Sequence, residues 1–192
     1  MATTTGIVNR ALDELGAEPI VNLTDGSTNA NTANRQFPEL RDSLLRSNVW
    51  NFAITHVRLA RLATAPIAGF DFQYQLPPDY IRMAKVSDND DHVGTLEYRL
   101  EGEKTLHTNA NEVYIRYVRR VEDPNKMTSD FREALSMKCA AAWAVKVTNS
   151  LAVKEGIEIL AKSTRQRAAS TDTIEDFPER LPEGSWVTER GR

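Results

Sequence analysis

Three histidines and one cysteine are the residues from which metal or nucleophilic chemistry would have to be built. His56, His92 and His107 stand too far apart to form an HExxH motif or another metal-binding spacing. Cys139 is the only cysteine, which excludes an internal disulfide and a cysteine-based zinc site. It lies among alanines on the apolar side of a predicted helix, so we expect a core residue rather than a nucleophile. The sequence predicts no metal site and no cofactor.

Two polar loops come close to ligand-binding motifs without matching them. Residues 88–94, DNDDHVG, have the acidic character of a calcium loop, but a histidine takes one ligand position, the glycine comes one place late and no glutamate closes the loop. Residues 101–105, EGEKT, lack the glycine spacing of a phosphate loop. We expect both to be solvated turns between strands. A hydrolase would need two carboxylates in contrasting environments, and 27 acidic residues leave no pair distinguished.

Basic residues raise the question of nucleic-acid binding. The candidates are Arg58, Arg61, Arg116, Arg119 and Arg120. Glutamates alternate with them along the neighbouring predicted strands, which favours a mixed sheet surface. The formal net charge of −3 and the pI of about 5.7 also argue against a dedicated nucleic-acid binder.

The chain's length and composition are typical of one soluble domain with an appendage. It has 192 residues, of which 41% are hydrophobic and 27% charged. The N-terminus does not have the pattern of a signal peptide, and the most apolar run, CAAAWAVKV, is too short to span a bilayer. We therefore expect synthesis in a cytoplasm and no membrane partner.

Helical periodicity opens the chain and strand periodicity follows it. Apolar residues at spacings of three and four predict a helix over 4–15, with a threonine at its start and Gly16 at its end. A second helix is predicted over about 29–46, kinked or divided at Pro38. From about 54 to 122, apolar and polar residues alternate, which predicts antiparallel strands covered on one face. Leu96, Tyr98 and Leu100 are expected on one such face.

Helical periodicity returns after Pro124. One helix is predicted from a cap at Ser129 or Asp130, and another over about 151–169. In the second helix the residues expected to face inward are Leu151, Val153, Ile157, Leu160 and Ala161. Lys162, Arg165 and Arg167 are expected near its C-terminal end, where cations suit the helix dipole.

The predicted fold is α+β: a helical bundle made of N-terminal and C-terminal helices, with a small antiparallel β-domain inserted between them. The domain covers residues 1–170, with helices within 4–48 and 129–169 and the β-region over 54–122. Residues 171–192 form an extended C-terminal tail whose prolines, glycines and charges exclude a long helix. Phe177, Leu181 and Trp186 in that tail are candidate partner-binding anchors.

Four segments, taken in order, carry a further pattern. They are NRALDELGAEPIVNLTDGS, RDSLLRSNVWNFA, YQLPPDYIR and VYIRYVRRVEDPNKMTSDFREALSMKCAAAWA. The more specific features are LGA at 15–17, Arg46 followed by WNFA at 50–53, LPxD at 76–79 and the late alanine-rich helix. In this combination the chain resembles the tail tubular protein A family, the head-to-tail adaptors of short-tailed bacteriophages. The resemblance covers roughly residues 7–160.

The resemblance implies a structural virion protein without enzymatic activity. Such adaptors form a ring, typically a dodecamer, between the capsid portal protein and the tail nozzle protein, and double-stranded DNA passes through the central channel without specific binding. On this interpretation the tail anchors Phe177, Leu181 and Trp186 dock on the portal. Trp50 and Phe52, at the predicted helix–sheet junction, are structural anchors that make the subunit rigid. The alternatives are a tail-associated peptidoglycan or polysaccharide hydrolase and a sequence-independent DNA-binding module.

Overall fold

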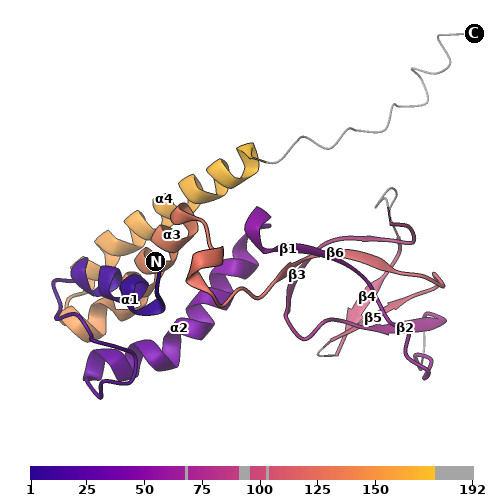
Figure 1. Ribbon diagram of the computed structural model, residues 1–192, viewed down its shortest axis with the longest axis horizontal. Coiled ribbons are helices and arrows are strands. Elements are labelled where there is room, and N and C mark those ends of the chain that lie inside the picture. Colours follow the sequence, from indigo (N-terminus) through magenta and orange to yellow (C-terminus); the bar gives the residue numbers. More distant parts are fainter. Residues whose placement is uncertain (68, 91–95, 103, 176–192) are drawn as a thin grey trace, which may run out of the picture.

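The helices and strands separate into two lobes, and the chain crosses between them twice (Figure 1). The computed structural model describes residues 1–67, 69–90, 96–102 and 104–175. In chain order its elements are α1 (Thr4–Asp13), α2 (Thr28–Ser47), η1 (Asn51–Ala53), β1 (Ile54–Arg58), β2 (Phe72–Gln75), β3 (Tyr80–Ser87), β4 (Arg99–Glu101), β5 (Thr105–Thr108), β6 (Tyr114–Arg119), η2 (Pro124–Lys126), α3 (Ser129–Thr148) and α4 (Leu151–Ile174). The predicted α+β fold, with the β-region inserted between helices, is confirmed.

The first two helices begin and end where local chemistry requires. The Thr3 side chain accepts from the Gly6 N–H and starts α1, and Gly16 has the left-handed φ of 64° that glycine adopts without strain. Helix α2 is continuous across Pro38, so of the two predicted outcomes, a kink or a division, the division is wrong. Pro38 has no N–H to donate to the Asn34 carbonyl one turn earlier. Both residues are exposed, so water can donate to that carbonyl instead.

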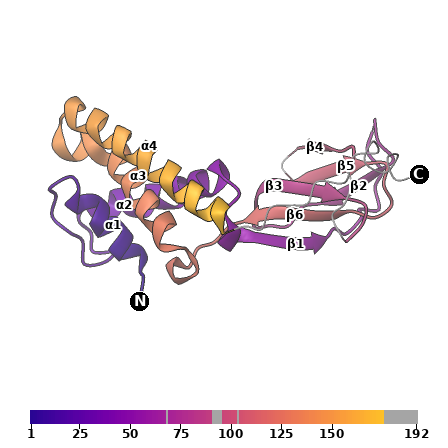
Figure 2. The same ribbon diagram turned by 90° about the horizontal axis from the view of Figure 1, so that it is seen from above.

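Helix α3 lies at the centre of the helical lobe, between α1, α2 and α4 (Figure 2). Its N-cap is Thr128, whose hydroxyl accepts from the Phe131 N–H, and not Ser129 or Asp130 as predicted. Buried residues lie on several of its sides, including Phe131, Cys139 and Trp143. The core of this lobe is therefore built around α3.

Helix α4 differs from its prediction in length and in orientation. It runs to Ile174, beyond the expected end near 169, so Lys162, Arg165 and Arg167 lie within the helix rather than at its C-terminal end. Ile157 is buried as expected, but Leu151, Val153 and Leu160 are exposed. The reason is that a stripe of smaller residues, completed by Thr164 and Ala168, packs against α3 instead.

The β-lobe consists of two three-stranded antiparallel sheets, with strand orders β1-β6-β3 and β2-β5-β4. A second core lies between them and includes Tyr74 and Leu106 from one sheet and Ile115 and Tyr117 from the other. The alternation in 113–117 is confirmed, whereas Tyr98 and Leu100 are exposed rather than inward, because β4 is a short edge strand. Strand β5 was not predicted, since TLHT is short and buries three successive residues instead of alternating.

Candidate functional site: a locked junction and an exposed helix face

The residues that could do chemistry are dispersed. Among the described residues, no group of three or more His, Cys, Asp or Glu side chains is placed to hold a metal ion. Cys139 is fully buried, and burial raises the pKa of its thiol to about 12, so the expectation of an inert core cysteine is confirmed. His92 and most of the 88–94 loop lie outside the described residues.

A hollow of about 520 Å³ lies beside β4 and β5. The Arg99 guanidinium lies 3.2 Å from Glu101 Oε1, and His107 Nδ1 lies 3.5 Å from Glu101 Oε2. Glu101 is the only carboxylate among the described lining residues. A two-carboxylate glycosidase site is therefore not assembled there by the residues that the structure places.

The junction between the lobes contains the two aromatics singled out in the sequence. Trp50 is fully buried and its indole N–H donates to the Leu44 carbonyl at 3.0 Å. Its ring packs edge-on against Phe131 of α3 at a centroid distance of 5.0 Å, and Phe52 packs on Phe131 at 4.9 Å. Phe52 is only partly buried and packs against the edge of the core. The position of both residues at the helix–sheet junction is as predicted.

A carboxylate near the end of α4 joins this junction. Both carboxylate oxygens of Asp172 accept from the backbone N–H of Asn51, at 3.0 and 3.2 Å. In return, the side-chain amide of Asn51 donates to the backbone carbonyl of Asp172 at 2.5 Å. Asp172 is buried, at 5% exposure. Residues 171–174 therefore belong to the folded body, not to the tail that was predicted to begin at 171.

Polar contacts also fasten α2 to the strands. Arg46 donates to the Ile81 carbonyl at 2.7 Å. Asp42 accepts hydrogen bonds from two arginines, at Oδ1 from Arg41 Nε at 2.9 Å and at Oδ2 from Arg120 Nε at 2.8 Å. These bonds hold the helical lobe to β3 and to the segment after β6, so the two lobes are connected by more than their two chain crossings.

Tyr117 adds a polar contact inside the β-lobe. Its hydroxyl donates to Asp79 at 3.0 Å. Burial first, and then the neighbouring carboxylate, raise the pKa of Tyr117 to about 12. Asp79 is the acidic residue of the LPxD segment, so that segment is tied to the central strand β6.

The basic residues considered as phosphate contacts are largely engaged within the chain. Arg58 lies 2.6 Å from Glu112, and Arg120 is held by Asp42. Arg61 stacks over the Phe72 ring at 3.7 Å and donates to Asn111. This arrangement agrees with the expected mixed sheet surface rather than with a phosphate-binding one.

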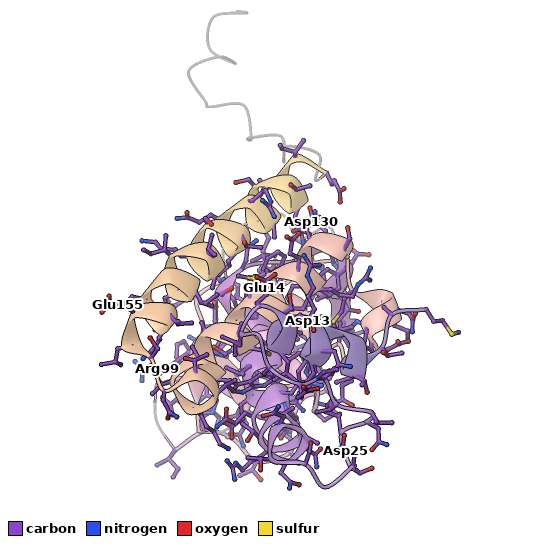
Figure 3. The ribbon with its side chains drawn as sticks, turned by 90° about the vertical axis from the view of Figure 1, so that its left-hand side faces the viewer. Asp13, Glu14, Asp25, Arg99, Asp130 and Glu155 are labelled. Atoms are coloured by element: carbon purple, nitrogen blue, oxygen red, sulfur yellow. The ribbon has the colours of Figure 1, made fainter. Side chains whose placement is uncertain are left out.

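Helix α4 exposes more aliphatic side chain than any other helix of the described chain. Leu151 is 68% exposed, Ile159 70% and Leu160 50%. Gly156 lies on the same side as Ile159 and Leu160, and a Cβ built there meets nothing within 4 Å. Viewed from the end of the helical lobe, α4 forms one flank of the molecule and Glu155 projects away from it (Figure 3). The surface formed by Gly156, Ile159 and Leu160 is called the α4 outer face below, whereas Leu151, nine residues before Leu160, lies on the opposite flank of the helix.

Two parts of this site could not be found in the sequence. Asp172 has no local signal, because its partner Asn51 is distant in the chain. In α4, Leu151 and Leu160 were expected to face inward, since leucines at helical spacing resemble a buried stripe, and Ile159 and Gly156 were not assigned to either side. Phe177, Leu181 and Trp186, the predicted partner-binding anchors, lie outside the described residues.

No protein-family model matches the chain, and no curated protein matches it significantly. In the described part of the chain, moreover, every helix is too short or too polar to cross a membrane.

Proposed function

We propose that this chain is a structural adaptor of a short-tailed bacteriophage, which forms a ring between the capsid portal and the tail nozzle and lets DNA pass through its centre. The proposal starts from the ordered sequence segments that resemble the tail tubular protein A family. The single structural observation that carries it is the α4 outer face, whose exposed aliphatic residues have no role inside one subunit.

The α4 outer face suits contact with a second copy of the chain. Helix α4 exposes Leu151, Ile159 and Leu160 to solvent. Full burial of each of these side chains by a neighbouring subunit would contribute on the order of 1.5–3 kcal/mol. Gly156 costs a helix interior about 1 kcal/mol relative to alanine, and nothing in the subunit occupies the space above it. A glycine at that position allows the backbone of a neighbour to approach closely.

The junction supports the same role from inside the subunit. A ring adaptor must transmit force between two partners without bending in its middle. Trp50, Phe131 and the Asp172–Asn51 pair lock the two lobes with apolar packing and buried hydrogen bonds. An enzyme that closes over a substrate would more often leave such a junction free to move.

Charge distribution is also compatible with a DNA channel. The net charge is −3, and Arg58 and Arg120, two of the basic residues considered as phosphate contacts, are paired to carboxylates. A wall that gripped DNA through many free cations would slow its passage. We expect DNA binding by the purified chain to be weak and independent of sequence.

Electron microscopy of the purified chain, alone and mixed with its portal protein, tests the proposal. We expect rings on the portal, and Ile159→Glu with Leu160→Glu should prevent them while leaving the circular dichroism spectrum unchanged. Val21→Glu is the matched control, because Val21 is an exposed aliphatic residue outside α4. Rings that form equally well with the double variant would contradict the assigned interface, and no ring with any partner would contradict the function.

A zymogram on host peptidoglycan tests the hydrolase alternative. The adaptor function predicts no clearing by the purified chain. Clearing that is lost on changing Glu101→Gln would instead make the hollow beside β4 and β5 an active site.

A further inference from the structure

Three cations surround a small hollow between α2, α3 and α4. Lys138, Lys162 and Arg165 line it, and its apolar wall is formed by Leu44, Ala134 and Ala161. Its volume is about 170 Å³. An enclosed cavity of about 150 Å³ accommodates a benzene ring, so one aromatic or aliphatic side chain fits this space. These six residues are called the cationic hollow below.

The cations of the hollow have no carboxylate partner in the described part of the chain. No ion pair within 4.0 Å involves Lys138, Lys162 or Arg165, and Lys138 donates instead to the Ser43 hydroxyl at 3.0 Å. Elsewhere the arginines commonly have carboxylates, as Arg10 and Arg167 do on Glu133. Partial burial, and then the nearby Arg165, lower the pKa of Lys138. Grouped cations of this kind favour an anionic occupant.

The chain itself contains a segment of matching chemistry. Residues 175–183, EDFPERLPE, carry four carboxylates and one arginine, and they alternate these charges with Phe177 and Leu181. We propose that residues 175–183 of one copy dock on the cationic hollow of a neighbouring copy, with the Phe177 ring in the apolar space and Asp176 and Glu179 toward the lysines and Arg165. This inference rests on the proposed ring, in which each subunit has a neighbour.

The distance from the end of α4 back to the cationic hollow favours docking of a neighbour's segment over the subunit's own segment. Along α4, Arg165 lies about 14 Å and Lys162 about 18 Å from Ile174, at 1.5 Å per residue. From Ile174 to Phe177 the chain spans at most about 11 Å when fully extended. A subunit's own Phe177 would therefore have to double back along α4 on a fully extended chain to approach its own hollow, whereas a neighbour's segment is not bound by this limit.

The contacts are individually weak and collectively effective in a ring. Partly exposed ion pairs contribute little one at a time and are screened by salt. Repeating the same docking in every subunit raises the effective concentration of each segment for its hollow. We therefore expect docking that depends strongly on ionic strength and that is fullest in the assembled ring.

Photocrosslinking of the full chain tests the inference. Phe177 is replaced by p-benzoylphenylalanine, and ¹⁴N- and ¹⁵N-labelled chains are mixed, irradiated with and without portal, and digested for mass spectrometry. We expect crosslinks of mixed isotope to peptides containing Leu44, Ala134 or Ala161, reduced at least about fivefold by Lys162→Glu with Arg165→Glu. Adding Asp176→Lys and Glu179→Lys to that variant should restore part of the yield, because these are the two carboxylates placed toward the cations.

Lys126→Glu serves as the matched control, because it reverses one exposed charge far from the hollow and should leave the crosslinks unchanged. Crosslinks only within one isotope, crosslinks unaffected by the charge reversals, or crosslinks to portal alone would each overturn the docking. Protection of Lys138 and Lys162 from a lysine reagent by DNA, without any crosslink, would identify phosphate as the occupant and overturn it too. Rings seen by microscopy without crosslinks would refute the docking alone, whereas the absence of rings would refute the proposed function.

Discussion

Helices α3 and α4 pack side by side, yet they differ in how many of their apolar side chains are buried within the subunit. Helix α3 places buried residues on several sides, so almost every apolar residue on it has a partner within the subunit. Helix α4 is longer and buries one narrow stripe, with Ile159 and Leu160 on the outside. The comparison shows that packing within the subunit accounts for most apolar side chains of α3 but not for those on the outer side of α4.

Removing the aromatic that packs on α3 should have the largest effect on stability. Trp50→Ala leaves a cavity against Phe131 and removes the indole hydrogen bond to Leu44. We expect the free energy of unfolding to fall by roughly 3–5 kcal/mol, measured by chemical denaturation. A loss below about 1 kcal/mol would mean that Trp50 is not part of the core, and the contrast with α4 would disappear.

Removing the hydrogen bonds between Asp172 and Asn51, called the latch here, should have an intermediate effect on stability. Asp172→Ala removes the buried carboxylate that accepts from the Asn51 N–H. The expected loss is about 1–3 kcal/mol in the same denaturation assay. Thr173→Ala is the neighbouring control, and because Thr173 is exposed it should change stability by less than about 0.5 kcal/mol. Equal effects of the two substitutions would exclude a structural role for the latch.

Gly156→Ala should stabilise the isolated subunit and weaken the assembly. A methyl group there meets nothing within 4 Å, and alanine loses less entropy in a helix, so a gain of about 0.4–1 kcal/mol is expected. Ring formation on the portal should become weaker, because the added methyl group keeps the neighbour at a distance. Gly16→Ala is the opposite control, since its φ of 64° strains alanine and should lower stability. A destabilised Gly156→Ala subunit would show that the glycine serves the fold.

Ile159→Ser should have the smallest effect on stability. Its side chain is exposed, so the free energy of unfolding should change by less than about 0.5 kcal/mol. Ile157→Ser, two positions away on the buried side of the same helix, should cost more than about 2 kcal/mol. Thermal denaturation of the two variants compares the faces directly, and similar losses would remove the distinction between them.

Local signals predicted much of the fold. The threonine before α1, the glycine after it and the alternation in β6 act between residues close in the chain, and their structures follow the prediction. Trp50 and Phe52 could be placed at the junction because helical periodicity ends just before them. Strand β5 could not be predicted, because a short buried strand has no alternation to detect. Nor could the latch, because Asp172 and Asn51 meet only after the two lobes are built.

The sequence by itself determined the helical segments, most of the extended ones and where the two lobes meet, because capping, periodicity and large aromatics act locally. Only the tertiary structure decided which side of α4 is buried. A helix with aliphatic residues on two sides can pack by either, and the closer fit of Ile157, Thr164 and Ala168 against α3 leaves Ile159 and Leu160 outside. The same packing brings Lys138 of α3 beside Lys162 and Arg165 of α4, because side chains on different helices become neighbours only when the helices dock.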